Sequence, residues 1–284
     1  MKRKSKTILT LISLFFIILI AWTLLGNTAL EVNEYEIVSD RIPKEFDGFR
    51  IAQVSDLHNT EFGEGNSKLI GLLSQTEPDI IVLTGDLIDS RQTDIEIALS
   101  FARDAMKIAP VYFVSGNHEA RVSEYEDLKM GLAEAGVIVL ENQKVEITRD
   151  GEAITLMGID DPSFQESYLF GDAESVAKQA IEMLQSESDG YTVLLSHRPE
   201  LFELYVKTGM DLVFCGHAHG GQFRLPFLGG LVAPNQGFFP EYDAGLFSEG
   251  ITNMIVSRGV GNSIIPIRFN NRPEIILAEL KVLR

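Results

Sequence analysis

The chain has 284 residues, of which 45% are hydrophobic, and a formal net charge of −17. This composition excludes a disordered chain and is typical of a globular protein with one large core or two small ones. Because Asp and Glu outnumber Lys and Arg by 41 to 24, no basic stripe is left to meet phosphates, and we expect no nucleic-acid partner.

An uncharged apolar segment, residues 7–30, follows the basic hexapeptide MKRKSK. About 20 apolar residues cross a bilayer as a helix, and the positive-inside rule keeps the basic flank in the cytoplasm. We therefore predict that residues 1–30 are a basic tail and a transmembrane signal-anchor, which makes this a single-pass protein of the cell membrane. A cleaved signal peptide, which would release a secreted protein, is the alternative, although NTALEV is a poor cleavage site.

Residues 31–284 are predicted to form one extracytoplasmic domain, because no Pro/Ser-rich or charged linker divides them. A possible strand at 34–38 leads into a series of apolar runs that are rich in Val and Ile and that each end in a polar cluster. These runs are residues 50–58, 79–86, 110–118, 191–197 and 211–217. Each is typical of a strand buried on both faces.

Helical patterns separate most of these runs, at residues 66–75, 93–106, 123–136, 173–186 and 199–208. Asn66 is a candidate N-cap, and Pro199 suits the first turn of the last helix. Ser123 and Glu126 form a candidate capping box, with Gly136 as the stop of that helix.

Further strands are predicted at residues 137–142, 144–151, 153–160, 251–259 and 274–280, with a turn at Asp150 and Gly151. Alternating strands and helices followed by hairpin-like strands indicate an α/β fold. The sequence therefore predicts a layered α/β sandwich of two mixed β-sheets flanked by helices.

The polar clusters at the ends of the five apolar runs contain every histidine of the chain. The candidate ligands there are Asp56, His58, Asp86, Asn117, His118, His197, His217 and His219. Ligands gather at the carboxyl ends of strands in open α/β sheets, so we expect these side chains to converge. One such histidine alone would more often be a hydrogen-bonded structural residue. The joint set of imidazole, carboxylate and amide groups suits Mn, Fe or Zn, and it is too large for one tetrahedral ion, so two divalent metal ions are expected.

The motifs DLH, GD, GNHE, SH and GHAH occur in the order and at the spacing found in calcineurin-like metallophosphoesterases, which the sequence resembles. The N-terminal anchor and the phrases GGQFRLPF and SRGVGNSIIPIRFNNRPE resemble a membrane-anchored bacterial branch of that family. The resemblance implies a first metal held by Asp56, His58 and His219, and a second held by Asn117, His197 and His217. Asp86 would bridge the two ions.

The resemblance also implies the chemistry. A hydroxide between the two ions would attack phosphorus, and His118 would be the general acid, with its pKa raised by Asp89. Asp89 matches a family aspartate that orients this histidine, and a helix N-cap is the alternative. A phosphodiester or pyrophosphate hydrolase is therefore expected, and a noncatalytic metal-binding scaffold or a dinuclear hydrolase of a non-phosphate bond are the alternatives.

The sequence leaves the roles of three further motif-adjacent positions open. In many relatives an arginine directly follows the aspartate that Asp89 matches, but Ser90 stands there and Arg91 comes one residue later. Arg198 is a candidate phosphate contact, although a surface role at a helix start is the favoured interpretation. Glu119 is expected to support the site at most.

The segment 220–250 shows no helix or strand pattern, and it lies close in sequence to the metal-binding motif. Its apolar residues include Phe227, Phe238, Phe239 and Tyr242. One hypothesis is that they meet a lipid or the membrane interface, so that the substrate would be a lipid-linked or cell-envelope phosphate ester. The favoured alternative is that they pack onto the sheet.

Overall fold

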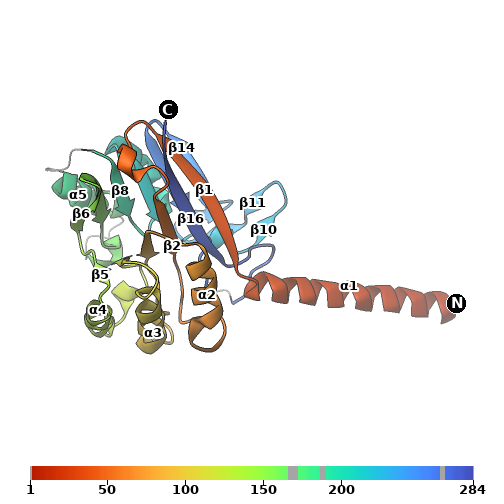
Figure 1. Cartoon of the computed structure of the whole chain (residues 1–284). Coiled ribbons are helices and arrows are strands. Elements are labelled where there is room, and N and C mark those ends of the chain that lie inside the picture. Colours follow the sequence, from red (N-terminus) through yellow and green to blue (C-terminus); the bar gives the residue numbers. More distant parts are fainter. Residues whose placement is uncertain (1, 166–171, 186–189, 263–265, 284) are drawn as a thin grey trace.

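The computed structural model describes residues 2–165, 172–185, 190–262 and 266–283. Helix α1 (Lys2–Thr28) extends away from the rest of the molecule (Figure 1). Its segment Lys6–Thr28 is long and apolar enough to cross a membrane, and it is not buried against the domain. The predicted helix at 173–186 is present as far as residue 185, and its last residue lies outside the described ranges.

Two six-stranded mixed sheets form the body of the molecule. The first has the order β1 (Glu31–Ser39), β16 (Glu274–Val282), β2 (Arg50–Val54), β3 (Ile80–Thr84), β4 (Val111–Val114) and β5 (Ile138–Val139). The second has the order β14 (Gly245–Glu249), β15 (Thr252–Val256), β9 (Leu212–Cys215), β8 (Thr192–Leu195), β7 (Glu152–Gly158) and β6 (Gln143–Arg149). Within each sheet, the strands that precede the histidine motifs run parallel.

Helices cover the outer faces of both sheets (Figure 1). The first sheet is covered by α2 (Ser67–Gln75), α3 (Ile95–Ala105) and α4 (Tyr125–Glu134), and the second by α5 (Ala173–Gln185) and α6 (Phe202–Lys207). The predicted layered α/β sandwich is confirmed.

The alternation of side chains along β3 shows why its sequence is apolar throughout. Ile81 and Leu83 pack under the helices, whereas Ile80 and Val82 pack against the second sheet. Successive strand residues point to opposite faces, and each face of this strand is covered. Burying one such side chain fully contributes about 1.5–3 kcal/mol relative to leaving it exposed, so the layers themselves hold the strand ends in place.

Helix ends were predicted less well than helices. Asn66 directly precedes α2, but its Oδ1 accepts a hydrogen bond from the backbone N–H of Phe62 instead of capping the helix. The capping box is wrong, because α4 begins at Tyr125 and Ser123 donates to Glu124. Gly136, with φ of 94°, follows the end of α4 as expected.

The segment 220–250 is more ordered than its sequence suggests. It contains two short hairpins, β10 (Arg224–Leu225) with β11 (Gly229–Gly230) and β12 (Val232–Ala233) with β13 (Gly237–Phe238). Tyr242 packs between the rings of Phe202 and Phe247, at centroid distances of 5.3 and 5.2 Å.

The expected packing of this segment's apolar residues onto the sheet is wrong for Phe227, Phe238 and Phe239, because these three are exposed.

Candidate active site

The candidate residues follow the carboxyl ends of five strands, three in the first sheet and two in the second. Asp56 and His58 follow β2, Asp86 and Asp89 follow β3, Asn117 and His118 follow β4, His197 follows β8, and His217 and His219 follow β9. Every one of these side chains is buried or nearly so. The parallel course of neighbouring strands brings the chain turns to one edge of the sandwich.

The backbone at this edge is strained. Asp56, His58, Asp86, His217 and His219 all have φ between 46° and 66°. Left-handed backbone at a non-glycine residue costs of order 1–3 kcal/mol and persists only where the surrounding structure enforces it. Its concentration at the strand ends indicates that these turns are built to aim side chains.

Two glycines let the chain pass close to the carboxylates. A Cβ on Gly116 would lie 2.3 Å from Asp86 Oδ1, and one on Gly216 would lie 2.4 Å from Asp56 Oδ2. A side chain at either position would displace a carboxylate, so GNH and GHAH need their glycines for space.

The first cluster joins Asp56, His58, Asp86 and His219, whose potential ligand atoms lie within 4.8 Å of one another. His58 Nε2 lies 3.2 Å from His219 Nε2 and 3.6 Å from Asp86 Oδ2. His219 Nε2 lies 3.4 Å from Asp56 Oδ1. Two imidazole nitrogens and two carboxylate oxygens that face one point are the donor set of a divalent cation.

The second cluster joins Asp86, His197 and His217 within the same 4.8 Å limit. His197 Nε2 lies 3.2 Å from Asp86 Oδ2, and its Nδ1 lies 2.7 Å from the carbonyl oxygen of Thr84. Donation from Nδ1 to that carbonyl leaves Nε2 as the free ligand atom.

Asn117 lies in the turn after β4, and the resemblance assigns it to the second metal. Its neighbour His118 donates its backbone N–H to Asp86 Oδ1 at 2.8 Å. Among the residues that the structure describes, Asn117 Oδ1 is buried without a hydrogen-bond partner. A buried polar atom without a partner is costly, and a cation between Asn117 and the second cluster would supply one. The residues present therefore fit two metal ions that share Asp86.

The electrostatics of the clusters agree with metal binding. Burial lowers the pKa of His58 to about 3 and holds the pKa values of His217 and His219 well below their usual range. These imidazoles are neutral near pH 7, as metal ligands must be. Burial would raise the pKa of Asp86, but the neighbouring His197 holds it well below its usual value, so Asp86 is ionised. Burial would lower the pKa of His197, but Asp86 raises it to about 10, so this imidazole must release its proton when a cation binds.

His118 lies next to the first cluster, with its ring centroid 4.6 Å from that of His58. Its Nδ1 accepts a hydrogen bond from the backbone N–H of Ser90 at 2.9 Å, whereas Asp89 Oδ1 is 3.7 Å from the same nitrogen. Burial lowers the pKa of His118, although Asp86 and Asp89 act in the opposite direction. The expectation of a raised pKa is therefore wrong.

Asp89 interacts chiefly with Arg91, whose Nε donates to Asp89 Oδ1 at 3.0 Å. Burial raises the pKa of Asp89, but the hydrogen bonds from Arg91 outweigh it and bring the pKa to about 2. The N-cap interpretation is wrong, because Asp94 caps α3 by accepting from the N–H of Glu96. A groove of about 420 Å³ opens here, lined in part by His58, Asp89 and Arg91.

Arg198 is the largest correction at the site. The expected surface role is wrong, because the residue is only 1% exposed. Its Nη2 donates to Asp161 Oδ1 at 2.8 Å, and its Nη1 lies 3.2 Å from His217 Nε2. Asp161 was missed, since a lone DDP sequence reads only as a turn, and no single-sequence signal ties it to Arg198.

Glu119 supports the backbone of the site. Its buried carboxylate accepts hydrogen bonds from the N–H groups of Asp86 and Gly116, both at 2.8 Å, and of Ile88 at 3.3 Å. It therefore ties the turn after β3 to the turn after β4. The last residue of GNHE thus has a clear structural role.

The chain is similar in sequence to a known family and to several known proteins. The model of the calcineurin-like phosphoesterase family matches residues 49–221. The chain belongs to this family. Calcineurin-like phosphoesterases are metal-dependent hydrolases of phosphate esters, and the clusters around Asp86 are the part of this chain that could hold the metal.

Relatives of this calcineurin-like phosphoesterase occur in bacteria and in animals. The metallophosphoesterase YkuE of Bacillus subtilis is 30% identical over 257 residues, which cover 89% of this chain and 86% of YkuE. The phosphodiesterase YaeI of Escherichia coli is 31% identical over 240 residues, or 82% of each chain. A transmembrane protein with a metallophosphoesterase domain from Danio rerio is 29% identical over 263 residues, which cover 88% of this chain and 57% of that protein.

Proposed function

We propose that this protein is a dinuclear metal-dependent phosphodiesterase or pyrophosphatase that works at a membrane surface. The observation that carries the proposal is the sharing of Asp86 by two ligand clusters, one with Asp56, His58 and His219 and the other with His197 and His217. Asn117 completes the second set. The similarity to a bacterial phosphodiesterase supports the choice of substrate class.

Two bound divalent cations, Mn, Fe or Zn, would supply an acidified water as nucleophile and would neutralise phosphoryl oxygens. The first contribution of the protein itself is to position the ligands and the proposed acid. Asp86 Oδ1 accepts the backbone N–H of His118, while Asp86 Oδ2 faces His58 and His197. The carboxylate that joins the clusters thereby also fixes the turn that carries the proposed acid.

His118 is the proposed proton donor to the leaving oxygen. Because its Nδ1 accepts from Ser90, the neutral ring carries its proton on Nε2. A neutral imidazole oriented in this way can donate to an alkoxide that leaves on its side of the site. Asp89 makes no hydrogen bond of ordinary length to this ring, because its Oδ1 lies 3.7 Å from His118 Nδ1 and its carboxylate is paired with Arg91. Its effect on the orientation of His118 is therefore indirect.

The test is hydrolysis of bis(p-nitrophenyl) phosphate by the full chain in detergent, with Mn²⁺ added, beside the His118→Ala protein. We expect metal-dependent turnover of this activated diester. With a diester whose leaving group is an alkoxide, turnover should fall by about 10²–10⁴-fold in the variant, the usual contribution of a general acid, whereas p-nitrophenolate leaves without a proton and should show a smaller loss. The variant should keep its full metal content. Turnover of amide or thioester substrates in place of phosphate esters would contradict the proposal, as would absence of turnover in a protein that holds two metals per chain.

We also propose that α1 anchors the protein with the catalytic domain outside the cytoplasm. The length and apolar character of Lys6–Thr28 support the anchor, and the basic residues before it support the orientation. The substrate would then be a phosphate ester of the membrane or the cell envelope. An intact N-terminus on the mature protein would exclude the alternative of signal cleavage.

A further inference from the structure

The β10–β11 hairpin ends in an uncovered apolar tip. We define the hairpin tip as residues Leu225–Leu228, of which Phe227 is fully exposed and Leu228 is 65% exposed. On the neighbouring β12–β13 hairpin, Phe238 and Phe239 are 75% and 61% exposed. Large apolar side chains gathered on adjoining hairpins mark a contact surface, whereas scattered ones do not.

The backbone is also unusual at one exposed phenylalanine of each hairpin. Phe227 has φ of 68° and Phe239 has φ of 56°. A bulky residue in the left-handed region is strained. Neither side chain gains burial in return within the part of the chain that the structure describes, so the strain serves to present the rings outward.

The hairpin is attached to the end of α1 through one short segment, residues 266–272. On one side of it, Asn27 of α1 accepts from the backbone N–H of Arg268 at 2.9 Å and donates to its carbonyl at 3.0 Å. On the other side, the N–H of Arg224 in β10 donates to the carbonyl of Phe269 at 2.9 Å. Gln222 Nε2 donates to the carbonyl of Ile267 at 2.8 Å. The hairpin and the membrane helix thus flank the same segment.

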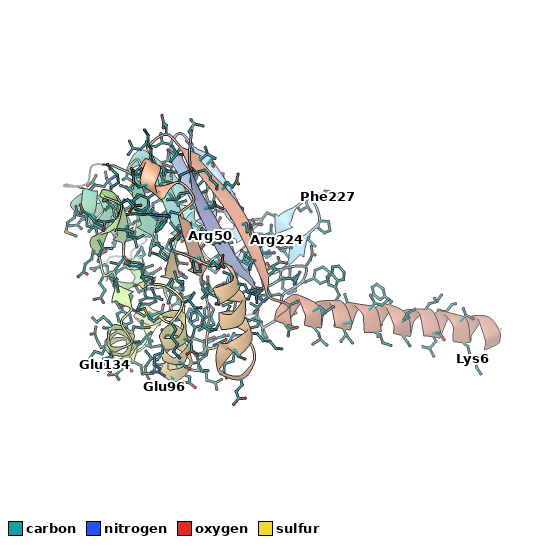
Figure 2. The ribbon with its side chains drawn as sticks, in the orientation of Figure 1. Lys6, Arg50, Glu96, Glu134, Arg224 and Phe227 are labelled. Carbon is teal, nitrogen blue, oxygen red and sulfur yellow. The ribbon has the colours of Figure 1, made fainter. Side chains whose placement is uncertain are left out.

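The direction of the hairpin fits a lipid surface. Phe227 projects from the body of the domain on the side from which α1 leaves, and it extends beyond the domain end of that helix (Figures 1 and 2). In a chain with 41 acidic residues, none lies between Gln222 and Gln236. At the base of the hairpin, Asp243 is paired with Arg224 at 3.0 Å, and the hairpin tip itself has no charged side chain. An apolar tip of this kind is suited to the interface of a bilayer.

We propose that the hairpin tip inserts into the bilayer surface beside α1 and forms a second membrane contact. The contact lies close to the candidate active site in the chain, because the turn His219–Gly221 leads directly into β10 and Asn271 Nδ2 donates to the carbonyl of His219 at 2.7 Å. Insertion of the tip holds this end of the site against the lipid headgroups. The inference rests on the proposed anchor, and it makes the membrane-facing phosphate ester the accessible substrate.

The test uses tryptophan as a depth probe in the full chain, reconstituted in phosphatidylcholine–phosphatidylglycerol vesicles with brominated acyl chains. Trp22 in α1 is the single tryptophan, so the unaltered protein reports whether α1 lies in the bilayer. Phe227→Trp and, as a matched control, Met130→Trp are then made in a Trp22→Phe background. Met130 is 55% exposed on α4, which lies away from α1 (Figure 1).

We expect brominated lipid to quench Phe227→Trp and to leave Met130→Trp unchanged, and iodide in the buffer to do the reverse. Quenching of Trp22 together with full iodide access to Phe227→Trp would overturn the inference and leave the anchor intact. Shielding of Phe227→Trp from both quenchers would assign the tip to a protein partner or a second copy, which also overturns it. If Trp22 itself is not quenched, the anchor and the tip contact fail together.

A second measurement separates the tip from the chemistry. Phe227→Ser should lower the hydrolysis of a diacyl phosphodiester embedded in vesicles and leave the hydrolysis of soluble bis(p-nitrophenyl) phosphate unchanged. If Phe227→Ser hydrolyses both the vesicle substrate and the soluble substrate as fast as the unaltered protein does, the tip has no role at the membrane. Loss of the soluble activity in both proteins would count against the proposed function instead.

Discussion

At the scale of single residues, the site depends on how closely the backbone approaches the carboxylates. Gly216 is the tightest case, since a Cβ there would lie 2.0 Å from Ser55 Oγ and 2.4 Å from Asp56 Oδ2. The following residue, His217, donates its backbone N–H to Asp56 at 3.1 Å. One position therefore sets the geometry of a carboxylate and of a candidate ligand together.

Gly216→Ala is expected to displace Asp56 and to reduce the metal content of the purified protein to less than two ions per chain. Overpacking of this kind costs typically 1–3 kcal/mol, which should also lower the thermal unfolding midpoint. Elemental analysis and thermal unfolding measure the two effects. Gly71→Ala in α2 is the control, because a Cβ there meets nothing within 4 Å and alanine favours the helix. Equal metal content in both variants would contradict the steric argument.

The buried pair of Arg198 and Asp161 is a second residue-scale feature. Burial would raise the pKa of Asp161, but Arg198 holds it below its usual value. The folded carboxyl thus releases its proton more readily than the unfolded one. The stability that this pair contributes is fully present above the unfolded pKa of about 3.9 and is lost as the pH falls through the folded value.

Arg198→Met should destabilise the protein by about 3–5 kcal/mol at neutral pH, because it leaves Asp161 buried without its counter-ion. Urea unfolding of the metal-free full chain measures the loss. A matched double variant, Arg198→Met with Asp161→Leu, should recover part of the stability, since the charge of Asp161 is removed together with that of Arg198. The recovery is incomplete because Glu200, whose Oε1 lies 3.4 Å from Arg198 Nη1, still loses its counter-ion. The single variant should also lose less stability on acidification below about pH 4 than the unaltered protein. A double variant no more stable than the single one would contradict this account.

At the scale of elements, the buried strands of the two sheets were recognisable from the sequence, whereas the short strands between residues 224 and 249 were not. The sequence predicts β2, β3, β4, β8 and β9 because all five are apolar on both faces, and those strands are present. The connection of α1 to the domain has no such signal. It is made by Asn27 and the segment 266–272, which are more than 200 residues apart in the chain.

Asn27→Leu should loosen this connection. The change removes the two hydrogen bonds between the Asn27 side chain and the backbone of Arg268. The backbone N–H and carbonyl of Arg268 then lose these partners, at a cost of about 1–3 kcal/mol for each group that stays buried. Amide hydrogen exchange in residues 266–272 should become faster, whereas exchange in β3 should not change. Thr28→Ala is the neighbouring control, because its hydroxyl bonds only within α1, to the carbonyl of Leu24. Unchanged exchange in Asn27→Leu would mean that other contacts hold the segment.

At the scale of the whole molecule, an acidic catalytic domain stands at the end of an apolar helix (Figure 2). Without the four basic residues of the tail, 20 Lys and Arg remain against 41 Asp and Glu. Like charge repels the domain from anionic lipids, and the proposed contact of the hairpin tip would oppose this repulsion at one end of the domain. The division of the chain at residue 30 into anchor and domain stays a prediction.

The proposed topology predicts that a protease added to intact bacterial protoplasts digests the domain and spares an epitope fused before Lys2. The physical reason is that the basic tail stays on the cytoplasmic side while the domain is translocated. Immunoblots against the tail and the domain measure the two products. A domain that is protected until the protoplasts are lysed would reverse the orientation.

The sequence by itself determined the layered α/β class, the buried strands and the set of candidate ligands. These features follow from local sequence patterns, because the spacing of apolar residues and the residue types can be recognised without knowing which distant residues they contact. The same reading missed the pairing of Arg198 with Asp161 and the contact of Ser90 with His118. It also favoured packing of Phe227 and Phe239 onto the sheet, whereas both rings are exposed.

Only the tertiary structure decided these features, since each depends on which distant segments meet. A buried arginine needs a carboxylate that the sequence places 37 residues away, and an exposed phenylalanine is recognised only when the described segments are seen to leave it uncovered. Residue type fixes what a side chain can do. Long-range packing fixes its neighbours, and the neighbours set its charge, its proton and its exposure.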